Sequence, residues 1–190
     1  MKKGIVVCVL AGLLLVSCDA LQQLTQLTNV KNCTFELDKV ESVQVAGINV
    51  MNLSGFSAID LVNLAACIKA KKVPVSLGVR VGVANPGASA ATVTRMDWLC
   101  TVDNKQLATG VIFDRYSVPA GGSVSIPLKV NMDAYDLFSS SGVDAIKAFI
   151  NSFSKEDHTS SRVAVKVKPT VELGSTTVTM PNYITLISNK

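Results

Sequence analysis

Charged residues are scarce in this sequence, and this argues against a nucleic-acid partner. Charged residues make up 17% of the 190 residues, and the formal net charge is +4. The densest basic group, Lys69, Lys71 and Lys72, is typical of the solvated end of a helix. Nucleic-acid-binding surfaces need many more clustered cations. We therefore expect no nucleic-acid partner.

Catalytic and metal-binding patterns are also missing. The one histidine, His158, lies in a polar stretch without a Gly-x-Ser-x-Gly motif or other context for a nucleophile. Asp133 and Asp136 follow a predicted strand, where solvated turn carboxylates are expected rather than an acid–base pair. No glycine-rich phosphate loop and no metal-ligand spacing is present. We predict that the protein is not an enzyme and holds no cofactor or metal.

No apolar run in the sequence is long enough to span a bilayer. The longest near the start, Ile5 to Val16, has 12 residues and follows Lys2 and Lys3, which is the pattern of a signal peptide. It ends in Leu15-Val16-Ser17-Cys18, which resembles the lipobox of bacterial lipoproteins. That resemblance implies cleavage before Cys18 and acylation of its thiol and new amine. The alternative is an ordinary secretory signal that contains a cysteine.

The leader sets the expected location. Residues 1–17 would be the lipoprotein signal peptide, and two or more acyl chains on Cys18 would hold the protein firmly at a membrane. Removing Lys2 and Lys3 leaves 16 basic against 14 acidic side chains, a net charge of +2. Residues 18–32 are predicted to be a tether, either a loose linker or a short helix. We expect a lipid-anchored protein of the bacterial cell envelope and assign no leaflet and no protein partner.

Three cysteines remain beyond the leader and the anchor: Cys33, Cys67 and Cys100. They form no Cys-x-x-Cys motif, which argues against a structural metal or a redox pair. Buried thiols are the favoured interpretation, because Cys100 shares a predicted strand face with Trp98 and Cys67 lies near a helix stripe. An exported protein can instead form one disulfide, for which Cys33 and Cys67 are candidates.

The most regular pattern is the segment from Val73 to Ala84. Every second residue is apolar, from Val73 through Val83, and the residues between them are small or polar. Because side chains alternate across a strand, this predicts a strand with one apolar face and one thin face. Asn85-Pro86 ends it. We expect one of the protein's own helices to cover the thin face, although it leaves room for a ligand.

The rest of the chain predicts further strands and two short helices. Ser57 to about Ala70 begins with a capping box of Ser57 and Asp60, and a second helix is expected over Val143–Phe153. Alternating residues predict strands from Cys33 onwards, a bend at Gly110, and a strand that ends at Pro169. We therefore expect residues 33–190 to form a mainly β domain, an antiparallel β-sandwich with two short helices.

Part of this pattern resembles a known family. Leu77-Gly78-Val79-Arg80-Val81-Gly82-Val83-Ala84-Asn85-Pro86 is similar to the alternating strand and Asn-Pro motif of the late-embryogenesis-abundant group 2 family, also called the WHy domain. Further matches, in the family's order, are Met96-Asp97-Trp98-Leu99, Leu107-Ala108-Thr109-Gly110, Val118-Pro119-Ala120 and Val124-Ser125-Ile126-Pro127-Leu128. Gly87 and the helix at Val143–Phe153 depart from the pattern.

The resemblance implies an immunoglobulin-like or fibronectin-III-like sandwich. It also implies a protective, stress-related role without defined catalysis, which is an analogy because fold does not confer function. The expected function is an envelope scaffold or stress-protective module. The alternative is a binding module that carries an apolar ligand, such as a lipid, between the sandwich and its helices.

Overall fold

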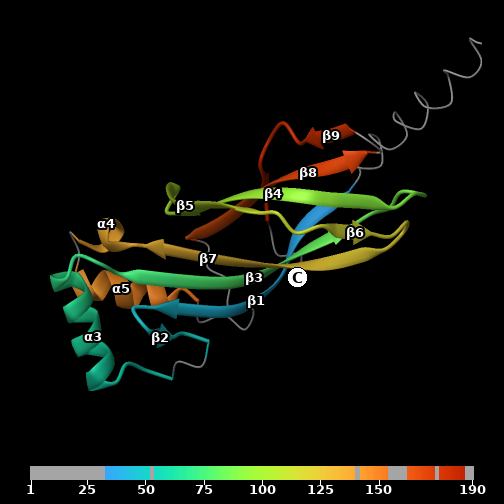
Figure 1. The fold of residues 1–190 in the computed structure, drawn as a ribbon. Coiled ribbons are helices and arrows are strands. Elements are labelled where there is room, and N and C mark those ends of the chain that lie inside the picture. Colours follow the sequence, from blue (N-terminus) through green and yellow to red (C-terminus); the bar gives the residue numbers. More distant parts are fainter. Residues whose placement is uncertain (1–32, 52–53, 140–141, 154–161, 174–175, 187–190) are drawn as a thin grey trace, which may run out of the picture.

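The structure is a computed structural model that describes residues 33–51, 54–139, 142–153, 162–173 and 176–186. Within these residues two antiparallel sheets form a β-sandwich, as predicted (Figure 1). Sheet A has the strand order β2-β1-β3-β7. Its strands are β1 (Thr34–Val45), β2 (Ile48–Asn49), β3 (Pro74–Ala84) and β7 (Ser123–Asp133).

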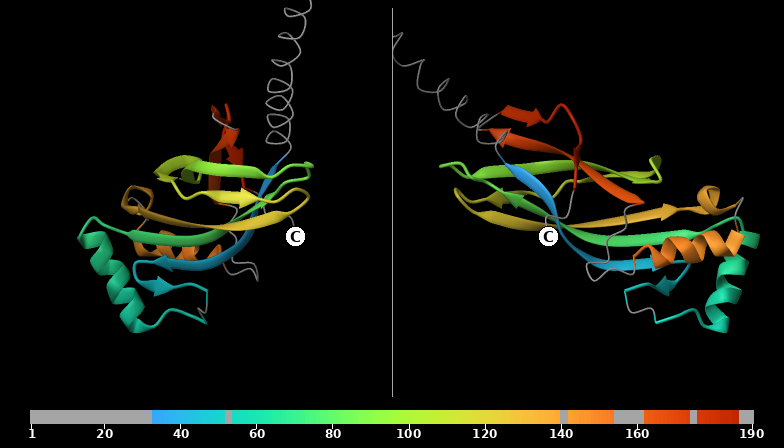
Figure 2. Two further views of the ribbon diagram at one scale, coloured as in Figure 1. Left: turned by 45° about the vertical axis from the view of Figure 1, so that its right-hand side comes forward. Right: turned by 180° about the vertical axis from the view of Figure 1, so that it is seen from behind.

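Sheet B lies over sheet A, and the two layers are seen separately in Figure 2. Its order is β10-β8-β4-β5, with β6 paired to β4 and β9 paired to β8. The strands are β4 (Ala91–Val102), β5 (Lys105–Ile112), β6 (Tyr116–Val118), β8 (Val163–Leu173), β9 (Thr176–Thr179) and β10 (Ile184–Thr185). Every pairing in both sheets is antiparallel.

Strand β3 lies at the centre of sheet A, as its period-two pattern predicts. It pairs with β1 on one side and with β7 along its whole length on the other. Its apolar residues, from Val75 to Val83, are all buried and face the interior of the sandwich. A burial of this kind contributes roughly 1.5–3 kcal/mol for each large apolar side chain. The alternation therefore fixes which face of sheet A builds the core.

The two predicted helices are present, and a third was not predicted. Helix α3 (Ala58–Lys69) has Ser57 as its N-cap, with both hydrogen bonds of the capping box to Asp60. Helix α5 is Gly142–Asn151, and helix α4 is Tyr135–Phe138. The described residues thus contain one short helix more than the two that were predicted. Four residues are too few to show a helical period, so α4 gives no signal in the sequence.

The helices do not cover the thin face of β3, which corrects that expectation. Ile146, Phe149 and Ile150 of α5 are buried in the same apolar cluster as the inward-facing residues of both sheets. The thin face stays partly exposed along its length. The helical stripes are therefore buried against the apolar interior, where burial is most favourable, and not against the small polar residues.

One strand detail differs from the sequence-based expectation, and a second position makes a close contact that the sequence does not reveal. β8 continues through Pro169, which is opposite Met96 beside a register shift in β4, and proline is tolerated where a bulge interrupts the ladder. β5 continues through Gly110, which faces the ring of Trp98. A Cβ at position 110 would lie 2.5 Å from Trp98 Cε2, so this glycine permits a close approach of the indole.

Several predictions lie outside the described residues. These are the signal peptide of residues 1–17, the anchor at Cys18, the tether of residues 18–32 and the environment of His158. Among the helices that are described, none has both the length and the apolar character needed to cross a membrane.

Candidate functional site

The outward-facing side of β3, with its neighbours on β1 and β7, is the candidate site. This surface, the outer face of sheet A, has Pro74, Ser76, Gly78, Arg80, Gly82 and Ala84 along its centre. Gly78 lies opposite Ser42 on β1, and a Cβ at position 78 would lie 2.5 Å from the Ser42 hydroxyl oxygen. The centre of this face is therefore low and polar, with one long side chain, Arg80.

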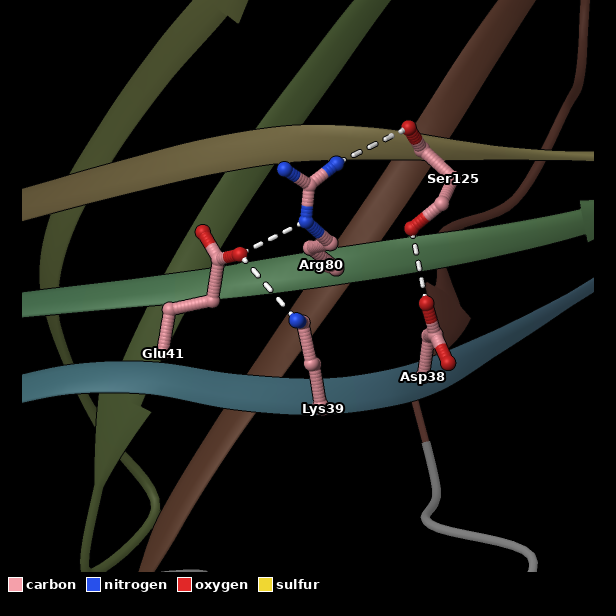
Figure 3. Close-up of polar contacts among 5 residues, drawn as sticks. All are labelled: Asp38, Lys39, Glu41, Arg80 and Ser125. Atoms are coloured by element: carbon pink, nitrogen blue, oxygen red, sulfur yellow. Dashed lines mark hydrogen bonds and ion pairs between the residues drawn. The ribbon is translucent and has the colours of Figure 1, made fainter.

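Arg80 is the centre of a charged cluster on this face (Figure 3). Its Nε donates to Glu41 Oε1 at 2.6 Å, and Lys39 Nζ lies 3.5 Å from the same oxygen. Arg80 Nη1 also reaches the backbone carbonyl of Ser125 on β7 at 3.5 Å. The Ser125 hydroxyl donates to Asp38 Oδ2 at 2.7 Å. Side chains from β1, β3 and β7 are thus linked across the sheet.

Two irregularities in β1 place the acidic side chains of this cluster. The register between β1 and β3 shifts between Leu37 and Lys39, and again between Val40 and Ser42. The residues skipped by these two shifts are Asp38 and Glu41. A β-bulge adds one residue to a strand and changes the direction of its side chain. Strict alternation in the sequence cannot reveal such a shift. The pairing of Arg80 with Glu41 was consequently not predicted.

The charges of this cluster balance one another. The hydrogen bond from Arg80 lowers the pKa of the Glu41 carboxyl below its usual range, so Glu41 is ionised at neutral pH. The cluster holds two cations and two carboxylates. Lys39 and Arg80 both contact Glu41, whereas Asp38 accepts from the Ser125 hydroxyl. The cluster contains no histidine, no cysteine and no activated nucleophile. It can form polar contacts, but it has no constellation for acid–base or nucleophilic chemistry.

Two shallow grooves lie at the end of sheet A beside α3. One, of about 550 Å³, is lined by residues that include Gln44, Lys72, Ser76 and Asn131. The other, of about 410 Å³, runs between α3 and the start of β3 and is lined by Ala46, Asn63, Ala66, Cys67, Ala70, Lys72 and Pro74. Lys72 and Pro74 belong to both, so the grooves are neighbours.

Asp133 is the last residue of β7 and Asp136 lies in α4, so neither is in the turn that the sequence predicted, although both are exposed. Asp133 Oδ1 accepts hydrogen bonds from the backbone amides of Val73 and Tyr135, at 2.9 and 3.0 Å. These bonds join the start of β3 to the turn between β7 and α4. Asp136 is exposed in the first turn of α4. Asp133 therefore has a structural role.

Within the described residues Cys33, Cys67 and Cys100 are thiols, and their positions argue against the bridge considered for Cys33 and Cys67. Cys33 precedes Thr34, which pairs with the last residue of β3, whereas Cys67 lines a groove with Pro74, the first residue of β3. Eleven residues of strand span about 35 Å, and a disulfide needs Cα atoms within about 7 Å. We therefore set the bridge aside. Cys100 is buried, and burial raises the pKa of its thiol to about 11.

The Asn-Pro motif forms a buried corner that sequence reasoning treated only as a strand end. Asn85 is 1% exposed. Its Nδ2 donates to the carbonyl oxygens of Ser89, Val118 and Pro119, at 2.9, 3.2 and 3.2 Å. Its Oδ1 accepts from the amide of Gly87 at 3.0 Å. Asn85 thereby fastens the loop after β3 to the turn after β6.

The part of the chain that the structure describes holds no group of three or more His, Cys, Asp or Glu placed to bind a metal ion. No protein-family model matches the sequence, and no curated protein matches it.

Solved structures resemble the fold at low identity. A crystal structure of a protein from Archaeoglobus fulgidus is 12% identical, with a TM-score of 0.39, over 77% of this chain and 94% of that one. A solution structure provisionally described as a late embryogenesis abundant protein is 14% identical, with a TM-score of 0.38, over 86% and 76%. A protein from Arabidopsis thaliana is 14% identical, with a TM-score of 0.38; the match covers 63% of this chain and 75% of that one.

Proposed function

We propose that this protein is a lipid-anchored, non-catalytic module of the bacterial cell envelope, with a scaffold or stress-protective role. The observation that carries the proposal is the leader, in which Lys2 and Lys3, the apolar run from Ile5 to Val16 and the sequence ending in Cys18 follow in the order of a lipoprotein signal. Cys18 receives the acyl chains, and the domain that begins at Cys33 follows it after a tether.

The described domain supports a non-catalytic role. On the outer face of sheet A, Arg80 and Lys39 are both paired with Glu41, and Asp38 accepts a hydrogen bond from Ser125. The buried polar residue Asn85 uses both its amide nitrogen and its oxygen in hydrogen bonds. Neither arrangement leaves a polar group poised for reaction. A scaffold or protective module needs only such a stable, satisfied surface.

The apolar-ligand alternative makes a different demand on the structure. A carried lipid needs apolar space between the sandwich and its helices. In the described domain Ile146, Phe149 and Ile150 of α5 fill the space beside the sheets and join the core cluster, and the groove of about 410 Å³ beside α3 is shallow and open to solvent. We therefore favour the scaffold. Native mass spectrometry of protein taken from cells separates the two, because a co-purifying lipid would support the carrier and a clean apo mass the scaffold.

The anchor is tested by Cys18→Ala. We expect this variant to lose acyl labelling and to leave the membrane fraction. Cys33→Ala is the matched control, because it removes a thiol beyond the predicted tether, and it should keep both properties. A Cys18→Ala variant that still sediments wholly with membranes would refute the anchor.

A further inference from the structure

Helix α3 has apolar residues on two opposite faces. Leu61, Leu64 and Ile68 turn towards the core, and Leu64 is fully buried. On the other side Ile59 and Val62 are 71% and 67% exposed, and Ala66 and Ala70 continue the same line along the helix. We call these four residues the outer stripe of α3. The rest of the helix surface is polar, with Asp60, Asn63 and Lys69, and exposed apolar side chains gathered on one face mark an interaction site.

The position of α3 leaves this stripe accessible. Figures 1 and 2 show the helix at one extremity of the molecule, projecting beyond the ends of the strands. The described chain begins at Cys33, at the other end of β1, about 40 Å away for 12 strand residues. The segment that precedes Cys33 therefore starts far from the stripe. An occupant from outside the molecule is the simpler solution.

We propose that the outer stripe of α3 binds the same stripe of a second copy of this chain, with the two helices antiparallel. The stripe is self-complementary in that orientation. Its first half carries the large residues Ile59 and Val62, and its second half carries the small residues Ala66 and Ala70. Antiparallel pairing sets the large half of each copy on the small half of the other, as a two-fold interface requires.

The groove beside the small half accepts the protruding side chain. This groove of about 410 Å³ is lined by Ala66, Cys67 and Ala70 of α3 and by Pro74 of β3, among others. Ile59 lies seven residues before Ala66, close to two helical turns, so both point the same way. In the antiparallel pair, Ile59 of each copy enters the groove of the other. A flat surface such as a membrane would leave this recess unfilled.

Charge favours the same orientation. Lys69 lies in the last turn of α3, with Lys71 and Lys72 just beyond it, whereas Asp60 lies in the first turn. Parallel pairing would bring the lysines of both copies together. Antiparallel pairing brings the lysines of one copy to the acidic end of the other and also opposes the helix dipoles. The stripe is about 17 Å long, so the interface is small and the dimer weak.

Disulfide trapping in the full chain tests the contact. In a Cys67→Ala background, which removes the thiol in the groove, Val62→Cys places a cysteine near the expected two-fold axis. Phe113→Cys is the matched control, because Phe113 is 70% exposed on another part of the molecule. Mild oxidation should link the Val62→Cys copies and leave the Phe113→Cys copies monomeric. Equal linking at both positions, or none at position 62, would overturn the proposal.

Sedimentation of the intact protein supplies the second readout. Ile59→Ser should weaken self-association at least about tenfold, because each dimer loses two buried isoleucine side chains. Val111→Ser, on sheet B, should leave self-association unchanged. A wild-type protein that is monomeric at all concentrations overturns the proposal. So does an Ile59→Ser variant that loses membrane binding but sediments like the wild type, which would assign the stripe to lipid.

Discussion

Among single residues, Asn85 has four side-chain hydrogen bonds at one buried corner. Four bonds join its side chain to Gly87, Ser89, Val118 and Pro119, and the side chain is almost completely buried. A buried carbonyl oxygen that loses its hydrogen-bond donor destabilises the folded state, because its desolvation is no longer compensated. The Asn-Pro motif is therefore explained by its structural role at this corner, because its polar atoms are all engaged within the protein.

Asn85→Ala should lower the free energy of unfolding by about 2–3 kcal/mol, because three carbonyls and one amide lose their partner. Chemical denaturation followed by circular dichroism measures it. Asn85→Asp should cost more as the pH rises, because three carbonyl oxygens would surround a carboxylate and raise its pKa in the folded state. Asn131→Ala, exposed on β7, is the control. Equal losses at positions 85 and 131 would contradict the role of the corner.

Among the elements, α3 begins where the sequence predicts because its cap is local. The Ser57 hydroxyl accepts from the Asp60 amide at 3.1 Å, and Asp60 Oδ2 accepts from the Ser57 amide at 2.8 Å. Both bonds join residues three apart, so the sequence alone specifies them. These hydrogen bonds also lower the pKa of the Asp60 carboxyl below its usual range.

Ser57→Ala should therefore destabilise the protein by about 1 kcal/mol, the usual cost of losing a side-chain cap. Ser57→Thr keeps the hydroxyl oxygen and should stay close to the wild type. Urea unfolding of the three proteins under one set of conditions compares them. If the threonine variant loses as much as the alanine variant, the cap is not the cause.

Local periodicity explains how much of the fold could be predicted. β3 follows from alternate burial along one strand, and α3 from a cap and a stripe, because each signal lies within a few residues. The cluster around Arg80 depends on bulges that place Asp38 and Glu41, and these arise only when β1 pairs with β3. The continuation of β8 through Pro169 likewise depends on a register shift in its partner β4. Long-range pairing decides such features.

The connection between β4 and β5 is fastened to β8 by an ion pair. Arg162 Nε donates to Asp103 Oδ1 at 2.9 Å, and Arg162 Nη2 lies 2.5 Å from Asp103 Oδ2. The guanidinium also lies over the ring of Phe149 in α5, 5.4 Å from its centre. The hydrogen bond from Arg162 lowers the pKa of the Asp103 carboxyl below its usual range.

The sign of the resulting pH dependence follows from this lowered pKa. The ion pair stabilises the folded protein at every pH above the unfolded value, near 3.9, and its contribution is lost as the pH falls through the folded pKa. Asp103→Asn should therefore lower stability by less than about 1 kcal/mol at pH 7, because both side chains are partly exposed. The difference from wild type should shrink as the pH falls below about 3.9 and disappear only below the lowered pKa of Asp103 in the folded protein. A difference that grows in acid would contradict the assignment.

At the scale of the whole molecule, the three thiols of the described domain differ in burial according to their place in the sandwich. Cys100 lies on the inner face of β4, fully buried, and its pKa is raised to about 11 by burial. Cys67 lies half-buried on α3 at one end of the sandwich, beside a groove open to solvent. Cys33 is half-buried at the other end, and burial raises the pKa of its thiol. The thiolate is the reactive form of cysteine, so a thiol that is buried and has a raised pKa reacts slowly for both reasons.

Thiol labelling at neutral pH should therefore separate into phases. Cys67 should react first in the native protein, and Cys100 only when the core opens, at a rate that follows global unfolding. Protein processed at Cys18 and then denatured without reductant should show three reactive thiols, whereas one disulfide among them would leave a single thiol. Cys67→Ala should remove only the fast phase, and Cys100→Ala only the slow one. If Cys100 were labelled as fast as Cys67, the core around β4 would open without global unfolding, and the prediction would be wrong.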